Sequence, residues 1–163
     1  SALGSRVVVT AGTDAKCQAC LDLGAALAIN YRTEDFVAVM AEKGIAADVI
    51  LDMVGADYVA RNFKVAALHG RIVNIAFQKG SRVEVDLLPI MLKRLTLTGS
   101  TLRPRTVAEK AEIARELEEI VWPLFASETV KPQIYKTFPL KEAAAAHALM
   151  ESSEHTGKIV LTV

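Results

Sequence analysis

The segment Arg6–Lys16 constrains the fold of this chain more than any other. It begins with the run Val7–Val9, three β-branched residues in succession, which is too short for a helical period and typical of a strand buried on both faces. Gly12 ends the run, and Thr13 or Asp14 can then accept a backbone N–H as the N-cap of a helix. Such a strand places backbone donors at its carboxyl end, where open parallel α/β sheets bind their ligands.

The residues at the end of this strand favour a phosphate group over a sugar diol. A site that binds a ribose 2′-hydroxyl usually carries Asp or Glu at the end of its second strand. That place holds Gly12 and Thr13 here, and Lys16 follows one helical turn later. A small hydroxyl residue and a cation suit the negative charge of a phosphate.

Strand-like and helix-like segments alternate along the rest of the chain. Further strands are predicted at Ala26–Tyr31, Asp48–Met53, Arg71–Phe77, Leu95–Leu102 and Lys158–Val163. Helices are predicted at Ala15–Leu23, from a Thr33 cap to Gly44, from Gly55 or Asp57 to Leu68, and at Leu140–Ser152. A longer helix is predicted from a capping box at Thr106–Glu109 to about Phe125, with a bend or break at Pro123. Lys131–Phe138 is predicted to be an extended edge or a linker. The alternation indicates an α/β fold with a doubly wound parallel sheet.

Composition and length exclude several classes of function. The chain has 163 residues, of which 52% are apolar, so it is long enough and apolar enough to fold around a core. Its 19 basic and 19 acidic residues cancel, so we expect no nucleic-acid partner and no acidic membrane surface. No stretch approaches the roughly 20 continuous apolar residues that span a bilayer, and the first residues do not resemble a secretory signal. With two cysteines only, the chain is expected in a reducing compartment, the cytoplasm.

No metal centre or nucleophile motif stands out. Cys17 and Cys20 have the C-x-x-C spacing, but no second Cys or His pair completes a zinc site, and both thiols fall within one expected helix. The three histidines, His69, His147 and His155, are scattered along the chain. Neither a phosphate-loop motif nor a G-x-S-x-G motif is present. We therefore predict no metal ligand and no catalytic acid, base or nucleophile in this chain.

Small, polar and aromatic residues follow each predicted strand. They are Gly12 and Thr13, Asn30 and Tyr31, Asp52–Gly55, Ile75–Phe77, and Thr101–Arg103. Because the carboxyl ends of parallel strands share one edge of a sheet, we expect these residues to line one crevice, where a dinucleotide binds. Lys16 and the flat ring of Tyr31 are available to the adenine end.

Several short segments occur in an order that is specific, although each segment is weak alone. They are Val7–Thr13 followed by Lys16, Leu23–Ala25, Ile29–Arg32, Glu34–Phe36, Leu51–Gly55, Gly70–Val73 and Gly157–Leu161. In this order the chain resembles the quinone oxidoreductase branch of the medium-chain dehydrogenase/reductase superfamily over essentially its whole length. The resemblance implies a Rossmann-type fold and, in this zinc-free branch, hydride transfer from NADPH to a quinone or another α,β-unsaturated carbonyl.

The resemblance also implies which residues bind the adenosine end of NADPH. Thr13 and Lys16 would hold the 2′-phosphate, with Gly12 beside them at the end of the strand. Tyr31 would pack at the same end, and Val54 would line the adenosine and its ribose.

A second group of residues is implied at the nicotinamide end. Phe77, Leu102 and Arg103 would lie close to the nicotinamide or its ribose. Lys158 belongs to a segment that approaches the cofactor cleft in relatives.

The chain departs from the family pattern at its beginning. The first strand, the glycine-rich turn that carries the pyrophosphate, and the N-terminal catalytic domain have no counterpart in the sequence. Residues 1–131 are expected to form an incomplete Rossmann domain, and residues 132–163 a return segment that packs on the catalytic domain in relatives. In the strand order 3-2-1-4-5-6 the absent strand lies between two that are present, which leaves two rows of backbone groups unpaired.

This departure leads to an expectation about partners. We expect the chain to be a fragment, inactive alone, whose partner is the missing N-terminal half on the same or a separate polypeptide. The strand Leu95–Leu102 is the usual dimerisation edge in this family, so the resemblance also implies a homodimer.

Two other interpretations stay open at the level of the sequence. One is a nucleotide-binding module without catalysis. The other is a flavodoxin-like or receiver-type α/β domain without a dinucleotide, although a receiver would need clustered acidic residues at its first strand and a lysine at its fifth.

Overall fold

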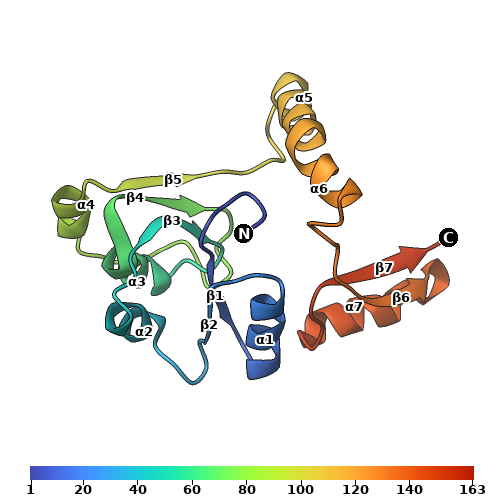
Figure 1. Ribbon diagram of the computed structural model, residues 1–163, viewed down its shortest axis with the longest axis horizontal. Helices are drawn as coiled ribbons and strands as arrows, with labels where there is room; N and C mark the ends of the chain where they lie inside the picture. Colours follow the sequence, from blue (N-terminus) through green and yellow to red (C-terminus); the bar gives the residue numbers. More distant parts are fainter. The chain divides into compact units, whose positions relative to one another are not determined.

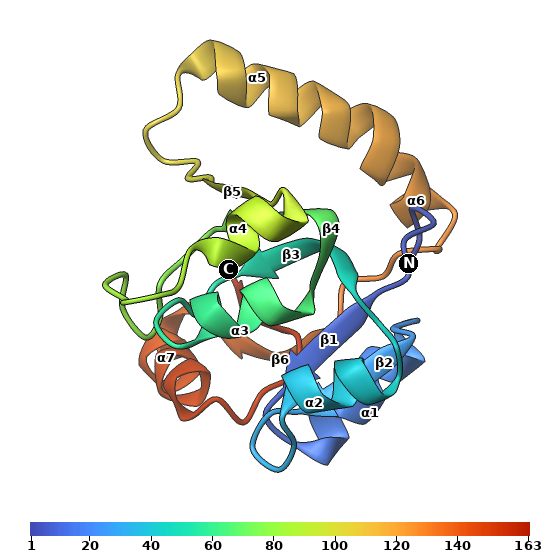
Figure 2. The same ribbon diagram turned by 90° about the vertical axis from the view of Figure 1, so that its left-hand side faces the viewer.

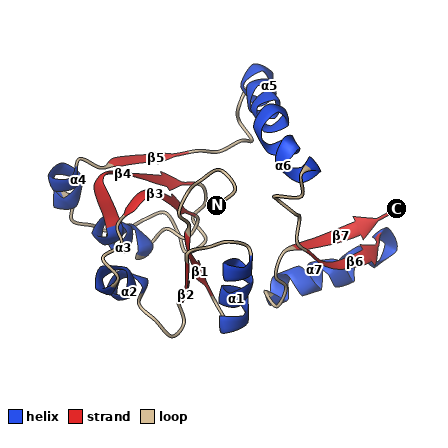
Figure 3. Cartoon of the chain, viewed as in Figure 1, coloured by secondary structure: helices blue, strands red, loops and turns tan.

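The computed structural model describes residues 1–163, in which every paired strand runs parallel to its neighbour (Figure 1). At least one helix separates each strand from the next along the chain (Figure 3), and this confirms the predicted α/β class. The chain forms two compact units, Ser1–Asn30 with Ala111–Val163 and Tyr31–Lys110, which we call the first and the second unit. No helix combines the length and the apolar character needed to cross a membrane.

The first unit opens with the strand–helix–strand segment that the sequence predicts. Strand β1 (Val8–Ala11) pairs with β2 (Leu27–Asn30), and α1 (Asp14–Asp22) connects them. The hydroxyl oxygen of Thr13 accepts the backbone N–H of Lys16 at 3.2 Å, so Thr13 and not Asp14 is the N-cap of α1. Ile29 is fully buried in this segment.

The predicted long helix is divided into three parts. It begins with α5 (Val107–Glu116), continues as the π-helical turn η1 (Leu117–Val121), and ends with α6 (Trp122–Ala126). Trp122 donates its N–H to the carbonyl five residues back, at Leu117. Pro123 has no N–H with which to continue the α pattern, so the break lies in the turn before the proline.

The capping box at the start of α5 is confirmed. Thr106 donates its backbone N–H to a Glu109 carboxylate oxygen at 2.7 Å, and Glu109 donates its N–H to the Thr106 hydroxyl at 3.3 Å. The Thr106 hydroxyl also donates to the same carboxylate oxygen, at 2.8 Å. This hydrogen bond, followed by the one from the Thr106 backbone N–H, lowers the pKa of Glu109.

The last part of the first unit is a second strand–helix–strand segment. Strand β6 (Ile134–Pro139) pairs with β7 (Lys158–Thr162), and the connection contains the 3₁₀ turn η2 (Leu140–Glu142) and α7 (Ala143–Ser152). The terminal strand and the alanine-rich helix are therefore confirmed. The preceding segment, predicted as an edge or a linker, contains a full strand because β7 supplies it with a hydrogen-bonding partner.

The second unit is a three-stranded sheet with helices packed against it. The sheet has the order β3 (Ala47–Asp52), β4 (Ala66–Asn74), β5 (Thr96–Gly99), and the helices are α2 (Phe36–Glu42), α3 (Tyr58–Val65) and α4 (Leu88–Lys93). Figure 2 shows α3 in front of β3 and β4. The core of this unit is built from Val59, Phe63, Ala66, Ile72 and Leu95.

Arg61 joins α2 to α3 in the second unit. Its guanidinium lies 4.1 Å from the ring centre of Phe36 and 4.9 Å from that of Tyr58, and it forms a 2.8 Å ion pair with Asp35. The hydrogen bond from Arg61, together with one from the Val37 N–H, holds the pKa of the Asp35 carboxyl below its usual value. Because Asp35 accepts the Val37 N–H, it caps α2, and the predicted cap at Thr33 is wrong.

Several predicted boundaries in the second unit are also wrong. Helix α3 ends at Val65, where the predicted helix continues to Leu68, and β4 begins at once. Lys93 explains the early stop, since its ammonium donates to three carbonyl oxygens at the end of α3, those of Phe63, Lys64 and Ala66, at 2.8–2.9 Å.

The displaced boundaries have two further consequences. His69, predicted in a helix-to-strand turn, lies within β4 at φ +62°. Strand β4 ends at Asn74, so the residues up to Phe77 form a loop and not the end of a strand.

The unpaired strand edges include one from each unit on the side where the sequence predicts a missing strand. In the first unit β1 pairs only with β2, and in the second unit β3 pairs only with β4. Val49 and Leu51 of β3 are 64% and 66% exposed, although a parallel strand of this composition is normally covered on both faces.

Candidate cofactor site

The start of α1 carries the three predicted phosphate-binding residues of the first unit. Gly12 and Thr13 link β1 to α1, and Lys16 lies in the first helical turn. The Thr13 oxygen already accepts a backbone N–H, so its own O–H remains available to an anion. The ammonium of Lys16 donates to the carbonyl oxygen of Ser153 at 2.5 Å and keeps two further N–H groups.

The carboxylate nearest to this point is turned toward another partner. Asp14 is the first residue of α1, and it accepts the side-chain amide of Asn30 at 2.6 Å. The Thr13 hydroxyl, the Lys16 ammonium and the N-terminal end of α1 thus belong to one short segment, and a hydroxyl, a cation and a helix N-terminus suit the phosphate group of a nucleotide.

Lys158 occupies a different place in the first unit. It is the first residue of β7, and its backbone N–H donates to the carbonyl of Gln133 at 2.6 Å. Its side chain forms no hydrogen bond or ion pair with Thr13 or Lys16. The role of Lys158 in cofactor binding therefore stays a prediction.

Asp52 organises the carboxyl end of the sheet in the second unit. Its buried carboxylate accepts the backbone N–H groups of Val54 and Gly55 at 2.7 and 3.1 Å, both on one oxygen. The other oxygen accepts the side-chain amides of Asn62 on α3 and Asn74 on β4, each at 3.1 Å. One side chain thus joins β3, the turn that follows it, α3 and β4.

Two loops cross at this edge and bring the predicted residues Val54 and Phe77 together. Lys79 donates its N–H to the Val54 carbonyl at 2.9 Å, and Ala56 donates to Gly80 at 3.0 Å. The crossing is so close that a Cβ built at Gly55 would lie 2.7 Å from the Phe77 ring.

This close approach leads to a first prediction. Gly55→Ala is expected to lower the free energy of unfolding by about 2–4 kcal/mol, because a Cβ would clash with Phe77 and with the Gly80 carbonyl oxygen, 2.6 Å away, at φ +70°. Gly44 is a matched control, since its φ is +62° with no atom within 4 Å of a Cβ, so Gly44→Ala should cost only about 1 kcal/mol. Urea unfolding of both variants measures the two losses in free energy of unfolding. Equal losses would show that Phe77 does not lie in close contact with Gly55.

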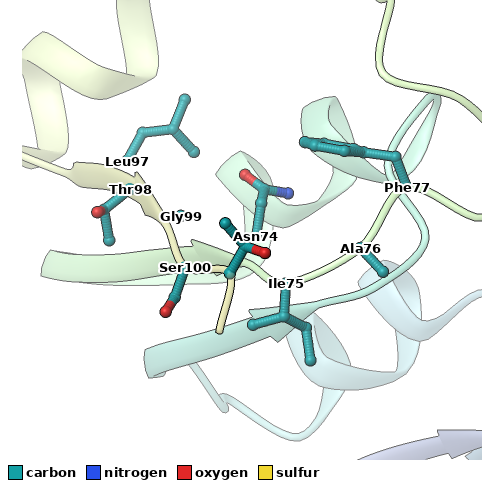
Figure 4. A pocket seen from close by; sticks show the side chains of 9 residues that line it. Asn74, Ile75, Ala76, Phe77, Leu97, Thr98, Gly99 and Ser100 are labelled. Carbon is teal, nitrogen blue, oxygen red and sulfur yellow. The ribbon is translucent and has the colours of Figure 1, made fainter. Parts of the chain in front are cut away.

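A hollow of about 450 Å³ lies beside Phe77 at the ends of β4 and β5. It is lined by Asn74–Phe77 and Leu97–Thr101, and Figure 4 shows the two sets of side chains on either side. The predicted residues Leu102 and Arg103 follow directly in the chain but do not line the hollow. Tyr31, after β2, is 45% exposed.

The model of the zinc-binding dehydrogenase family matches residues 23–161 of this chain. The chain belongs to the zinc-binding dehydrogenase family. This membership confirms the predicted resemblance to the medium-chain dehydrogenase/reductase superfamily, and it leaves the flavodoxin-like interpretation without support.

Similar proteins of this family include reductases about twice as long as the chain. Quinone oxidoreductase 1 of Escherichia coli is 32% identical over 167 residues, which cover 98% of this chain and 50% of the relative. The 2-haloacrylate reductase of a Burkholderia species is 30% identical over 166 residues, covering 98% and 48%. The crystal structure of the Thermus thermophilus quinone oxidoreductase, also described with NADPH, matches with a TM-score of 0.84 at 26% identity, covering 99% and 51%. The chain therefore spans about half the length of these zinc-binding dehydrogenase relatives.

The family's description names zinc, but the residues of this chain do not form a zinc site. Protein zinc sites need at least three or four ligands. No group of three or more His, Cys, Asp or Glu side chains lies close enough to hold an ion. Cys17 and Cys20 both lie on α1, and the structure contains no disulfide. No step is therefore assigned to a metal held by this chain.

Sequence reasoning missed two residues of the site. Ser153 holds Lys16 through a backbone carbonyl, and a carbonyl has no signature in the amino-acid sequence. Asn74 falls inside a predicted strand, although a polar side chain after the apolar pair Ile72 and Val73 could have marked it as the end of that strand.

Proposed function

We propose that this chain is the larger part of the dinucleotide-binding domain of an NADPH-dependent reductase. The observation that carries the proposal is the start of α1, where the Thr13 O–H and two N–H groups of the Lys16 ammonium remain available and the Asp14 carboxylate accepts the Asn30 amide. Such a site attracts the 2′-phosphate of NADPH, because the Lys16 ammonium and the N-terminal end of α1 carry positive charge and the Thr13 hydroxyl can donate a hydrogen bond. When bound, the nicotinamide supplies the hydride.

We assign the other predicted cofactor-binding residues to the two ends of the dinucleotide. Tyr31 and Val54 bind toward the adenosine, and Phe77, Leu102 and Arg103 toward the nicotinamide. The hollow beside Phe77 supports the second assignment, since it is open and the apolar side chains of Ile75, Phe77 and Leu97 form part of its lining. Residues 1–131 would then form the dinucleotide-binding domain, and residues 132–163, with Lys158, the return segment.

The proposed acceptor is a quinone or another α,β-unsaturated carbonyl. The names of the relatives support it, since quinone oxidoreductases and a 2-haloacrylate reductase both act on conjugated electron-poor double bonds. We assign no acid or base from this chain. Its residues would contribute by positioning the nicotinamide against the acceptor.

The proposed partner is the N-terminal half that the relatives carry. The chain spans half of their length, and β1 and β3 each leave an edge open for another strand. The exposed Val49 and Leu51 support a covering layer from the same half. We further propose a homodimer through the edge strand β5, and a reaction in the cytoplasm.

The cofactor assignment predicts a selective effect at Lys16. Lys16→Ala in the intact protein is expected to weaken NADPH binding about 10–100-fold, because a charge-assisted hydrogen bond contributes about 1.5–3 kcal/mol, and to change NADH binding less than twofold. Titration of each nucleotide against the quenching of its fluorescence checks this. Lys43→Ala is the control, since Lys43 is an exposed residue at the end of α2.

Two outcomes would revise the proposal. Equal losses for NADPH and NADH would mean that the 2′-phosphate binds elsewhere. Binding of NADPH without reduction of any quinone or enone would favour the non-catalytic module. The same preparation, examined by native mass spectrometry, tests the partner, because a mass equal to one copy of this chain alone contradicts both the missing half and the homodimer.

A further inference from the structure

The α7–β7 loop reaches Lys16 from the far end of the sequence. Ser153, the C-cap of α7, accepts the Lys16 ammonium although 137 positions separate the two residues. We infer that Ser153 is a positioning residue for Lys16, and that the α7–β7 loop thereby determines how strongly the site prefers a 2′-phosphorylated dinucleotide. This inference rests on the proposed function of Lys16.

The physical reason is the freedom of a lysine side chain. A lysine that must be ordered on binding loses rotamer entropy worth up to about 2 kcal/mol. The carbonyl of Ser153 holds the ammonium before any ligand arrives, and two N–H groups remain for phosphate oxygens. A charged side chain that is already ordered binds its ligand more tightly than one that must be ordered on binding.

The direction of this carbonyl is set by the local backbone. Ser153 has φ +58°, the left-handed conformation that ends α7, and its N–H donates to the Met150 carbonyl at 3.2 Å. Ser152 stabilises the same turn, because its hydroxyl donates to Leu149 at 2.8 Å and accepts the Glu154 N–H at 3.2 Å.

The electrostatics of the two helix ends act in the same direction. The C-terminal end of α7 carries the partial negative charge of its last carbonyls, and this attracts the ammonium of Lys16. The first turn of α1 carries partial positive charge and adds to the attraction for an anion. The C-terminal end of α7 therefore holds the Lys16 ammonium, and the N-terminal end of α1 adds to its attraction for an anion.

The test uses two substitutions of Ser153 with opposite effects on the backbone. Ser153→Val, made in the intact protein, disfavours the left-handed conformation and turns the carbonyl away, whereas Ser153→Gly retains that conformation. Ser153→Val is expected to weaken NADPH binding about 3–10-fold and NADH binding less than twofold, and Ser153→Gly to leave both unchanged.

A double-mutant cycle separates positioning from a general loss of structure. In the Lys16→Ala background, Ser153→Val should have no further effect on NADPH, because the residue that it positions is gone. An equal effect in both backgrounds, or equal losses for NADPH and NADH, would overturn the inference.

A second variant of the loop and the selectivity of Lys16→Ala distinguish a failure of the positioning role from a failure of the proposed function. If Ser153→Val fails to fold, Ser152→Ala loosens the same turn, and a selective NADPH loss of about 2–3-fold is then expected, whereas its absence contradicts the inference. If Lys16→Ala itself is not selective for NADPH, the proposed function has failed. If Lys16→Ala is selective and neither loop variant is, only the positioning role has failed.

Discussion

Replacing Asp52 with alanine is expected to lower the free energy of unfolding by about 3–5 kcal/mol. The substitution leaves four donors without their acceptor: two backbone N–H groups and the amides of Asn62 and Asn74. Each buried donor without a partner costs about 1–3 kcal/mol, with the part-buried ones at the lower end. Hydrogen exchange should therefore become at least a hundredfold faster for the amides of β3 and β4.

Asp52→Asn is the informative control. Its remaining oxygen can still accept the N–H groups of Val54 and Gly55, and the side-chain amide of Asn74 can turn to offer its own oxygen. We expect Asp52→Asn to cost about 1–2 kcal/mol, less than half the loss in Asp52→Ala. Equal losses in the two variants would mean that the negative charge, and not the set of hydrogen bonds, holds this edge of the sheet together.

The second large effect is expected at Gly157, just before β7. A Cβ there would overlap the carbonyl oxygen of Gln133 and lie 2.9 Å from the Gln133 Cβ, and φ is +98°. The carbonyl cannot withdraw, because it accepts the Lys158 N–H at 2.6 Å and begins the pairing of β6 with β7. Gly157→Ala should therefore cost about 3–5 kcal/mol, the sum of backbone strain and overlap.

Gly80 separates these two contributions. Its φ of +106° is close to that of Gly157, but no atom lies within 4 Å of a Cβ, so Gly80→Ala carries the strain without the overlap. We expect a loss of about 1–2 kcal/mol for this control. Hydrogen exchange locates the effect of Gly157→Ala, which should appear in the amides of Ile159–Leu161. Unchanged exchange at these amides would contradict the close approach of the two segments.

The strands that could be predicted from the sequence are those with a purely local signature. The apolar runs of β1, β2, β3 and β7 begin and end within two residues of the predicted positions, because glycine or polar residues bound each of them. The capping box of α5 is equally local, since both partners lie within one turn.

The features that escaped prediction depend on residues far away in the chain. The end of α3 is determined by Lys93, nearly thirty positions later, which no helical pattern around Val65 can show. Strand β6 was predicted only as an extended edge or a linker, and its pairing with β7 decides for the edge strand. Helix α4 was not predicted at all, although Pro89 in its first turn is a typical start signal.

For the candidate site the same division holds. Thr13 and Lys16 were found because a strand, a cap and a cation follow one another in the sequence. Their partner Ser153 could not be found, because its contribution is a carbonyl direction set by a left-handed residue.

The open edges of β1 and β3 have a consequence for biosynthesis. An unpaired edge with exposed Val49 and Leu51 can accept a strand from any chain, including another copy of itself. We expect this polypeptide, when produced without the proposed N-terminal half, to form strand-paired aggregates, and the more so at higher concentration. The time at which the proposed N-terminal half is synthesised then matters as much as its affinity for this chain. If that half is already present, it would occupy the strand edges before two copies of this chain meet.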